Sequence, residues 1–337
     1  MKKRCIDANT AVAEVSYACS ELAVIYPITP ASPMAELADE LSAKQTPNLF
    51  DSVTQVVQMQ SESGAAGTLH GALTCGCLTT SFTCSQGLLL MLPNMYKIAG
   101  ELLPCVLQVS ARSVATHALN IFCDHSDVMA CRQAGWIMLV SSTAQESADF
   151  AFIAYMGALK SQIPVLHFFD GFRTSHECAS IETMEFDEMK SLLDTNDIAR
   201  FKARGLNPDK PIQRGTAQNP DVFFQNREAA SAYYAAAPQI LQEMMDKASQ
   251  VTGRKYTLFE YHGARNAEEV IVTMGSSAVV ARLTAEYLQA QGDKVGVINV
   301  RLYRPFSASA FSSALPSTCK KITVLDRTKE AGALGEP

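Results

Sequence analysis

Continuous apolar runs recur along the first half of the chain, and between them small and apolar residues repeat at helical spacing. Runs of this kind are typical of parallel strands that are buried on both faces. They predict strands at Ala23–Tyr26, Val53–Met59, Leu78–Phe82, Cys105–Val109, Ile137–Val140 and Val165–Phe169. Helices are predicted at Ala11–Leu22, Ser32–Lys44 and Glu62–Leu73. This alternation predicts an α/β fold with a doubly wound, mainly parallel sheet.

The pattern changes over residues 185–260, where turn-forming segments at Arg204–Pro208 and Arg214–Pro220 interrupt the alternation. One long helix is predicted from Arg227 to about Gln250. Large aromatic side chains favour burial, so this connector is expected to pack against the protein. The aromatic residues are Phe223, Phe224, Tyr233 and Tyr234. We therefore assign residues 1–260 to a first domain that ends in an irregular connector.

A second α/β unit is predicted over residues 261–337. Its predicted strands are Val270–Met274, Lys294–Val300 and Lys321–Leu325, and its predicted helices are Ala278–Gln291 and Ser307–Leu315. A doubly wound domain normally continues beyond three strands. We therefore expect a smaller, incomplete second domain in a partial or truncated chain.

Composition excludes several classes of protein. The net charge of −6 argues against nucleic acid or an acidic membrane surface as the main partner. The apolar run Leu88–Leu92 ends at Pro93, far short of a membrane span. The ten cysteines include no C-x-x-C pair, so zinc ribbons and ferredoxin-type cluster motifs are absent. Since no secretory signal opens the sequence, we expect a cytoplasmic protein with reduced cysteines.

The segment Tyr26–Pro33, Y-P-I-T-P-A-S-P, places Thr29 on a stiff backbone directly after a predicted strand. Ser32 is expected to cap the next helix, with Pro33 at its first position and Glu36 in its first turn. Ligands of open α/β sheets bind beyond the carboxyl ends of strands. Thr29 is therefore a candidate binding residue, and a proline-stiffened connection without a ligand is the alternative.

Glu62 and Arg112 also follow predicted strands. Glu62 opens a helix rich in glycine and alanine, where a carboxylate that only complements the helix dipole is the alternative interpretation. Arg112 can bind a carboxylate in bidentate fashion, and a surface salt bridge is its alternative. Paired with Thr29, Arg112 would form a site for a small 2-oxo acid.

Two further polar segments carry weaker hypotheses. The segment His117–Asp127 holds metal-ligand types without tight helical spacing, so we predict a polar loop or interface there and no metal site. His176 and Glu177 have acid–base chemistry, but a hydrogen-bonded loop is the favoured interpretation. The sequence has no G-x-G-x-x-G, Walker A or G-x-S-x-G motif, which disfavours dinucleotide, P-loop and α/β-hydrolase functions.

Together these motifs resemble the single-chain pyruvate:ferredoxin (flavodoxin) oxidoreductases over nearly the whole chain. Tyr26–Pro33 is similar to the family's Y-P-I-T-P-S-S-P, with Ala31 in place of a serine. Glu62 and Arg112 lie in segments similar to Q-S-E-x-G-A-A-G and S-A-R-x-x-x-T-H-A-L. Further family blocks are Thr80–Glu101, His176-Glu177, Arg214–Asp221 and Leu325–Pro337. The last two blocks favour the single-chain form over the separate-subunit 2-oxo acid:ferredoxin oxidoreductases.

The resemblance implies that the first domain is the pyrimidine-binding half of a thiamine diphosphate site. Glu62 would contact the aminopyrimidine ring, where a carboxyl group promotes the imino tautomer, while Thr29 and Arg112 would hold pyruvate. The second domain resembles a transketolase C-terminal domain. The implied reaction is oxidative decarboxylation of pyruvate to acetyl-CoA, with electrons passing to ferredoxin or flavodoxin.

The chain departs from the family pattern in what it lacks. The G-D-G motif that accompanies diphosphate and magnesium is absent, as are cluster cysteines. Thiamine diphosphate with magnesium is therefore expected to be shared with a missing domain, and 4Fe-4S clusters and coenzyme A to belong only to the complete enzyme. We expect a fragment that is inactive alone, and the glycine- and alanine-rich helix suggests a homodimer. The alternatives are an alpha-type subunit of another 2-oxo acid:ferredoxin oxidoreductase and a non-catalytic interaction module.

Overall fold

The computed structural model describes residues 1–337, and its larger sheet has seven strands. These are β2 (Leu22–Ile25), β3 (Gln55–Gln58), β4 (Thr79–Thr83), β5 (Val106–Ala111), β6 (Ile137–Ser141), β7 (Val165–Asp170) and β12 (Leu302–Arg304). Their order is β12-β6-β7-β5-β4-β2-β3, and only β12 runs antiparallel to its neighbour. The predicted doubly wound, mainly parallel sheet is confirmed.

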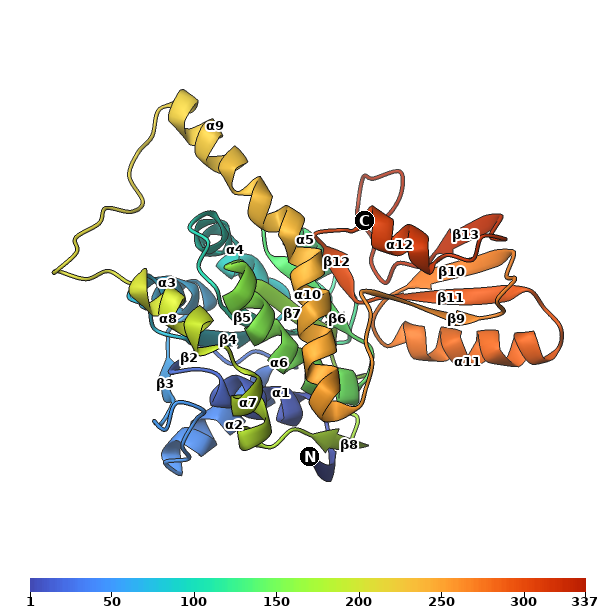
Figure 1. Ribbon diagram of the computed structural model, residues 1–337, viewed down its shortest axis with the longest axis horizontal. Coiled ribbons are helices and arrows are strands. Elements are labelled where there is room, and N and C mark those ends of the chain that lie inside the picture. Colours follow the sequence, from blue (N-terminus) through green and yellow to red (C-terminus); the bar gives the residue numbers. More distant parts are fainter.

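Helices cover both faces of this sheet (Figure 1). One face carries α1 (Ala8–Ala18), α2 (Ser32–Ala43) and α6 (Ala144–Ser161), and the other carries α3 (Glu62–Thr74), α4 (Ser85–Gly100) and α5 (Ser126–Ala130). The long helix α10 (Ser231–Thr252) packs on the outer side of α6. Nearly every residue of α6 is therefore buried, between the sheet and a second layer of helix. No helix of the structure is both long and apolar enough to cross a membrane.

Some elements were not predicted. β1 (Lys2–Ile6) pairs antiparallel with β8 (Ala179–Thr183) in a two-stranded sheet of its own. Helix α4 also runs through Pro93, where the apolar run was expected to end. Pro93 is exposed, and the carbonyl that loses its helical partner belongs to Leu89, which is only partly buried.

The connector contains α7 (Phe186–Leu192), α8 (Thr195–Ala203), α9 (Pro220–Ala229) and α10. The predicted single helix is in fact α9 and α10, which meet at Ala230, and α9 stands away from the body (Figure 1). The predicted burial of the aromatic residues is wrong for most of them, because α9 has no buried residue. Phe223 and Phe224 are 53% and 70% exposed, and Tyr233 is exposed as well. Only Tyr234 is partly buried, and its hydroxyl donates to the carbonyl of Gly135 at 2.8 Å.

The second sheet has the order β13-β10-β11-β9, with β9 antiparallel to β11. Its strands are β9 (Phe259–Gly263), β10 (Glu269–Thr273), β11 (Val295–Val300) and β13 (Lys321–Val324), accompanied by α11 (Ser277–Ala290) and α12 (Ala308–Ala314). The three predicted strands and two predicted helices are present. β12 belongs to the seven-stranded sheet although it lies within residues 261–337, and the domain division at residue 260 stays a prediction.

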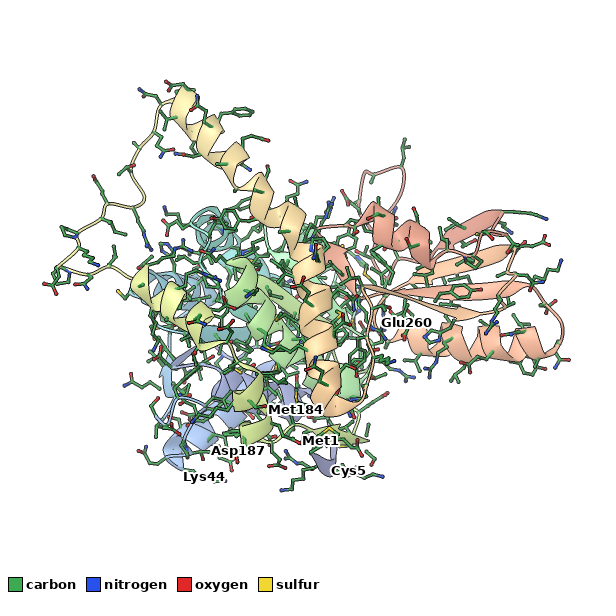
Figure 2. The ribbon with its side chains drawn as sticks, viewed as in Figure 1. Met1, Cys5, Lys44, Met184, Asp187 and Glu260 are labelled. Atoms are coloured by element: carbon green, nitrogen blue, oxygen red, sulfur yellow. The ribbon has the colours of Figure 1, made fainter.

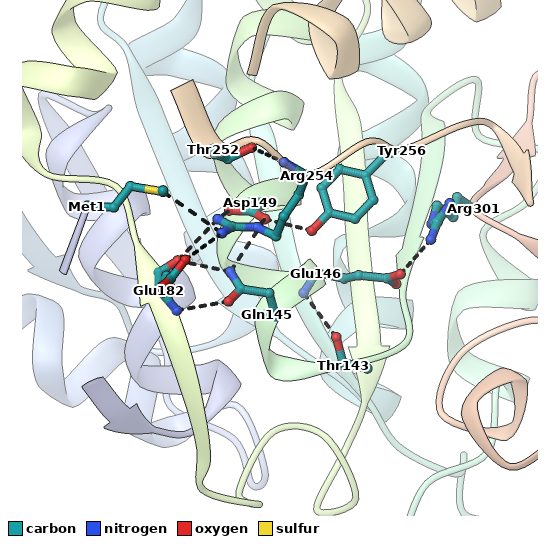
Figure 3. A network of polar contacts seen from close by, with 10 residues as sticks. All are labelled: Met1, Thr143, Gln145, Glu146, Asp149, Glu182, Thr252, Arg254, Tyr256 and Arg301. Carbon is teal, nitrogen blue, oxygen red and sulfur yellow. Dashed lines mark hydrogen bonds and ion pairs between the residues drawn. The ribbon is translucent and has the colours of Figure 1, made fainter. Parts of the chain in front are cut away.

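A polar network ties the start of the second unit to α6 (Figure 3). The buried carboxylate of Asp149 accepts hydrogen bonds from Arg254 at 2.7 and 2.8 Å and from the hydroxyl of Tyr256 at 2.7 Å. Arg301 donates to Glu146 at 2.7 Å and also to Glu260, which lies at the junction of the second unit with the body (Figure 2). Asp149 and Glu146 belong to α6 and Glu260 to β9, so paired charges fix the start of the second unit against α6.

Asp170, at the end of β7, makes a second link between the two sheets. Its buried carboxylate accepts from His125 Nε2 at 2.8 Å, from the Ser276 hydroxyl at 2.5 Å, and from Arg327. The backbone N–H of Ser276 also donates to it at 3.2 Å, so Asp170 caps the start of α11 from the neighbouring unit. Burial opposes the charge, but the His125, Ser276 and Arg327 contacts hold the pKa of Asp170 well below its usual range.

We expect Asp170→Ala to destabilise the chain by about 3–5 kcal/mol, because it leaves a buried donor and a guanidinium without their acceptor. Urea unfolding at pH 7 measures the loss. Limited proteolysis should in addition cut the connector after Thr252 sooner than in the parent chain. Asp209→Ala, at an exposed loop position, is the control. An unfolding midpoint equal to that of the control would contradict this role.

Candidate active site

The ends of β2, β4 and β5 bring three candidate segments to one edge of the sheet. These strands are neighbours in the order β5-β4-β2, and the chain after each one leads to Thr29, to α4 or to Arg112. Arg112 Nη1 donates to the backbone carbonyl of Thr29 at 2.7 Å. The structure therefore places Thr29 and Arg112 in contact, at the edge where open α/β sheets bind ligands.

The Thr29 loop differs in detail from the prediction. Helix α2 begins at Ser32, and its N-cap residue is Ala31, which makes no side-chain capping bond. The prediction that Ser32 caps the helix is therefore wrong. Pro33 is the second helical residue and not the first, and Glu36 lies beyond the first turn. Hydrogen bonds to a backbone carbonyl hold the loop instead. The Thr29 carbonyl accepts from Cys84 Sγ at 3.2 Å as well as from Arg112. Burial raises the pKa of Cys84 to about 12, which keeps this thiol protonated as a donor.

Arg112 is a buried cation without an acidic partner. The residue is 7% exposed, and its Nη2 donates to Gln86 Oε1 at 3.0 Å. Its Nε is buried and has no hydrogen-bond partner. A surface salt bridge, the alternative interpretation of Arg112, is excluded by this burial. Removing a charge from water is costly unless it is paired, so an anion that bound here would be favoured.

Glu62 is the first residue of α3, whose N-cap Ser61 accepts from the backbone N–H of Gly64 at 3.1 Å. Glu62 as a residue is 7% exposed, and its carboxylate makes no hydrogen bond within the chain. It packs against Gly87 so closely that a Cβ there would lie 2.7 Å from Glu62 Oε1. The same Cβ would lie 2.7 Å from the hydroxyl oxygen of Thr83, which is buried and has no partner. Glu62 thus contributes an unpaired carboxylate beside an unsatisfied hydroxyl. A carboxylate that only complemented the dipole of α3 would not need to be buried in this way.

The first turn of α4 joins these residues into one site. Gln86 accepts from Arg112, and the next residue, Gly87, contacts Glu62. The site therefore presents an exposed threonine, a buried guanidinium and an unpaired carboxylate around one helix start. Thr29, Glu62 and Arg112 were predicted from the sequence, whereas Gln86 was not. The signal was present, because Gln86 also follows a predicted strand.

Asp127 holds the backbone of two site segments in place, a role that the sequence analysis did not predict. Its buried Oδ2 accepts from the backbone N–H of Ser85 at 2.7 Å and from that of Arg112 at 3.0 Å. Its Oδ1 accepts from the backbone N–H of Val128 at 2.7 Å. Ser85 has a φ of +50°, a left-handed conformation that is unfavourable for a residue with a side chain. One carboxylate therefore fixes the start of α4 relative to the end of β5.

The protonation of Asp127 should make the stability of the folded chain depend on pH. Burial outweighs the three N–H contacts and raises the pKa of Asp127 to about 6, whereas an unfolded chain gives aspartate a pKa of about 3.9. The folded state thus binds the proton more tightly, and the stability that the protonated form contributes is lost as the pH rises from about 4 to about 6. We expect the stability of the parent chain relative to Asp127→Asn to fall by about 2–3 kcal/mol over that range. Urea unfolding at four pH values measures it, and parallel curves for the two proteins would contradict it.

The four histidine and aspartate side chains in the segment His117–Asp127 lie in different surroundings. His117 is exposed, and Asp124 accepts from the backbone N–H of Ser126 at 2.8 Å. His125 pairs with Asp170, and Asp127 binds backbone N–H groups. The structure does not bring these four side chains together around one point.

A different trio, Cys123, His125 and Asp170, has ligand atoms within 4.8 Å of one another. Asp170 in that trio already accepts from the cation Arg327 and from Ser276, as the link to α11. A guanidinium in this position supplies the positive charge that a metal ion would bring, so we assign the trio to the link between the sheets.

His176 and Glu177 are exposed and interact within their own loop. His176 Nδ1 lies 2.7 Å from the Ser175 hydroxyl, and its ring stacks on Phe172 with centroids 4.9 Å apart. Glu177 pairs with Arg173 at 3.1 Å. These contacts favour the hydrogen-bonded loop over an acid–base pair.

The fold and site define an α/β protein with a buried, unpaired guanidinium at the ligand-binding edge of a parallel sheet. Residues 14–246 match the family described as pyruvate flavodoxin/ferredoxin oxidoreductase, thiamine diphosphate-binding. Residues 267–336 match the pyruvate:ferredoxin oxidoreductase core domain II. The chain belongs to the pyruvate flavodoxin/ferredoxin oxidoreductase family.

Relatives of the chain carry the same family name. A pyruvate:ferredoxin oxidoreductase from Moorella thermoacetica is 58% identical over 337 residues, which is 100% of the chain and 29% of that protein. A pyruvate-flavodoxin oxidoreductase from Rhodospirillum rubrum is 56% identical, over 98% of the chain and 28% of that protein. One from Nostoc sp. is 54% identical, over 98% of the chain and 82% of that relative. The chain thus spans less than a third of the length of the first two relatives.

Among solved structures, a 2-oxoglutarate:ferredoxin oxidoreductase from Magnetococcus marinus matches 96% of the chain and 57% of its own chain, with a TM-score of 0.72 and 20% identity. A split-gene transketolase matches 95% of the chain and 78% of its own, with a TM-score of 0.50 and 11% identity. At these identities the likeness shows the fold alone.

Proposed function

We propose that the chain supplies the pyruvate-binding residues and the pyrimidine side of a thiamine diphosphate site in a pyruvate:ferredoxin (flavodoxin) oxidoreductase. The full-length protein would oxidatively decarboxylate pyruvate to acetyl-CoA. The observation that carries the proposal is the buried guanidinium of Arg112, which has no acidic partner and an unsatisfied Nε. The names of the family and of the relatives supply pyruvate, ferredoxin and flavodoxin.

In this proposal Arg112 binds the carboxylate of pyruvate. A guanidinium presents parallel N–H donors that match a carboxylate, and the burial of Arg112 strengthens the attraction. Thr29 borders the same position through its contact with Arg112, and its exposed side chain offers a hydroxyl to the substrate. The Thr29 carbonyl and Gln86 fix the orientation of the guanidinium.

The residues around Glu62 fit the pyrimidine ring of thiamine diphosphate. The unpaired carboxylate of Glu62 can hold a proton shared with a ring nitrogen, and the lack of a Cβ at Gly87 allows this carboxylate to lie directly against the start of α4. The buried Thr83 hydroxyl lacks a partner at the same place. When bound, thiamine diphosphate supplies an activated thiazolium carbon for decarboxylation of a 2-oxo acid. The chain carries no G-D-G motif for the diphosphate and magnesium, so these ligands would come from another domain.

The test is pyruvate-dependent reduction of a viologen dye by the full-length oxidoreductase that contains this chain. We expect activity that requires thiamine diphosphate, magnesium and coenzyme A, and a clear preference for pyruvate over 2-oxoglutarate. A preference for 2-oxoglutarate would contradict the substrate, and the absence of thiamine-dependent activity would contradict the enzyme class.

We also propose that the full-length protein is a cytoplasmic homodimer that passes electrons from its 4Fe-4S clusters to ferredoxin or flavodoxin, without nucleic acid or a membrane as partner. All ten cysteines of the chain are unpaired, as expected in a reducing compartment. Analytical ultracentrifugation tests the dimer, and reduction of each purified carrier tests the acceptor. A monomer, or no transfer to either carrier, would contradict this part of the proposal.

A further inference from the structure

Gln86 lies on the first turn of α4, where it contacts Arg112, and the next residue, Gly87, contacts Glu62. Its carboxamide has one oxygen acceptor and two N–H donors. A guanidinium is only a donor, so the group that faces Arg112 Nη2 at 3.0 Å must be the Gln86 oxygen. The chemistry of Arg112 therefore determines which way the amide is turned.

Ser85 is a second neighbour of the same amide oxygen. The Ser85 hydroxyl oxygen lies 2.5 Å from Gln86 Oε1, and its single proton can go either there or to the Ser113 carbonyl. Ser85 is itself fixed, since its backbone N–H donates to Asp127 at 2.7 Å and its hydroxyl lies 2.7 Å from the Ser113 carbonyl. Turning the amide over would place its N–H groups against the Arg112 guanidinium, which is electrostatically unfavourable.

With the oxygen held by Arg112, the amide nitrogen of Gln86 is left without a partner in the chain. Gln86 is only partly buried, and its Nε2 makes no hydrogen bond. The adjacent guanidinium also has an unsatisfied donor, the buried Nε of Arg112. Gln86 thus presents unused N–H groups beside a buried guanidinium that has no acidic partner, which suits an anionic ligand.

We propose that Gln86 is a further substrate-binding residue, whose Nε2 donates to the carboxylate of the 2-oxo acid that Arg112 holds. This inference rests on the proposed function. It assigns Gln86 two tasks at once, since the oxygen orients Arg112 and the nitrogen contacts the substrate. Glutamate separates these tasks, because it has the shape of glutamine and keeps an oxygen for Arg112 but has no N–H donor for the substrate.

The test uses the full-length oxidoreductase with Gln86→Glu and Gln86→Met, and Gln225→Glu on the exposed helix α9 as the matched control. The carboxylate of the Glu variant would pair with Arg112 and repel the substrate anion. We expect Gln86→Glu to raise the KM for pyruvate at least 20-fold with kcat changed less than threefold, and Gln86→Met to raise it three- to tenfold. The dissociation constant of oxamate, an unreactive pyruvate analogue measured by calorimetry, should rise in parallel. The control should change neither value by more than twofold.

The outcomes separate this inference from the proposed function. KM and the oxamate dissociation constant within twofold of the parent in Gln86→Glu would overturn the role of Gln86. A loss of thiamine diphosphate affinity equal to the loss of oxamate affinity would overturn it as well, because that pattern indicates a distorted helix start. If the parent enzyme binds neither oxamate nor pyruvate, the proposed function itself fails.

Discussion

Replacing Arg112 by alanine should raise the KM for pyruvate far more than the requirement for thiamine diphosphate. The variant removes a charge-assisted contact to the substrate carboxylate, which we expect to cost about 2–4 kcal/mol, or roughly 30- to 900-fold in affinity. Steady-state kinetics of the full-length oxidoreductase, with pyruvate and thiamine diphosphate varied in turn, measures both effects.

The arginine-to-lysine variant is the matched control for charge. Arg112→Lys keeps the positive charge but loses the fork that reaches both the Thr29 carbonyl and Gln86. Its KM should fall between those of the parent and the alanine variant. An equal loss of affinity for pyruvate and for thiamine diphosphate in Arg112→Ala would contradict a substrate role and indicate misfolding.

Glu62→Gln should leave the fold intact and slow proton exchange at the thiazolium carbon of bound thiamine diphosphate by a factor of about 10²–10⁴, the usual contribution of a positioned acid–base group. The substituted amide has the shape of the carboxyl group and keeps contact with Gly87, but it cannot carry the proton. Quenched-flow exchange followed by proton NMR measures the rate.

Two controls accompany this variant. Circular dichroism and the unfolding midpoint should match the parent, since Glu62 makes no hydrogen bond within the chain whose loss could destabilise it. Ser63→Ala, at the exposed neighbouring position, should exchange at the parent rate. An unchanged rate in Glu62→Gln would remove Glu62 from the chemistry.

The buried part of the fold was predictable because its strands are apolar on both faces. The ends of β4, β5, β6 and β7 lie within two residues of the ends that the apolar runs predicted. The edge strand β3 is shorter than the predicted Val53–Met59, and three of its four residues are exposed, so its pattern carries less information. β1 and β12 could not be found in this way, since β1 is polar and mostly exposed and β12 has only three residues.

Part of the site could be predicted from one rule, namely that ligands bind beyond the carboxyl ends of parallel strands. That rule selected Thr29, Glu62 and Arg112 because each follows a predicted strand. It could not assign a role to Asp127, whose carboxylate reaches back fifteen residues to the N–H of Arg112. Nor could it show that Arg112 lacks an acidic partner, because that depends on which side chains the fold brings near it.

The exposed connector shows where the rule of aromatic burial fails. Phe223 and Phe224 lie on α9, which extends from the body and has no buried residue. Composition indicated that these side chains favour burial, but it could not show whether the partner surface lies within the same 337 residues.

The central claim is that Thr29, Glu62 and Arg112 form one pocket that holds pyruvate beside thiamine diphosphate. A crystal structure of the full-length oxidoreductase with both molecules bound tests it most directly. We predict a pyruvate carboxylate oxygen within about 3.2 Å of the Arg112 guanidinium, and the Glu62 carboxyl group within hydrogen-bond distance of the aminopyrimidine ring. Pyruvate bound away from Arg112, or a pyrimidine ring that contacts a different carboxylate, would contradict the account.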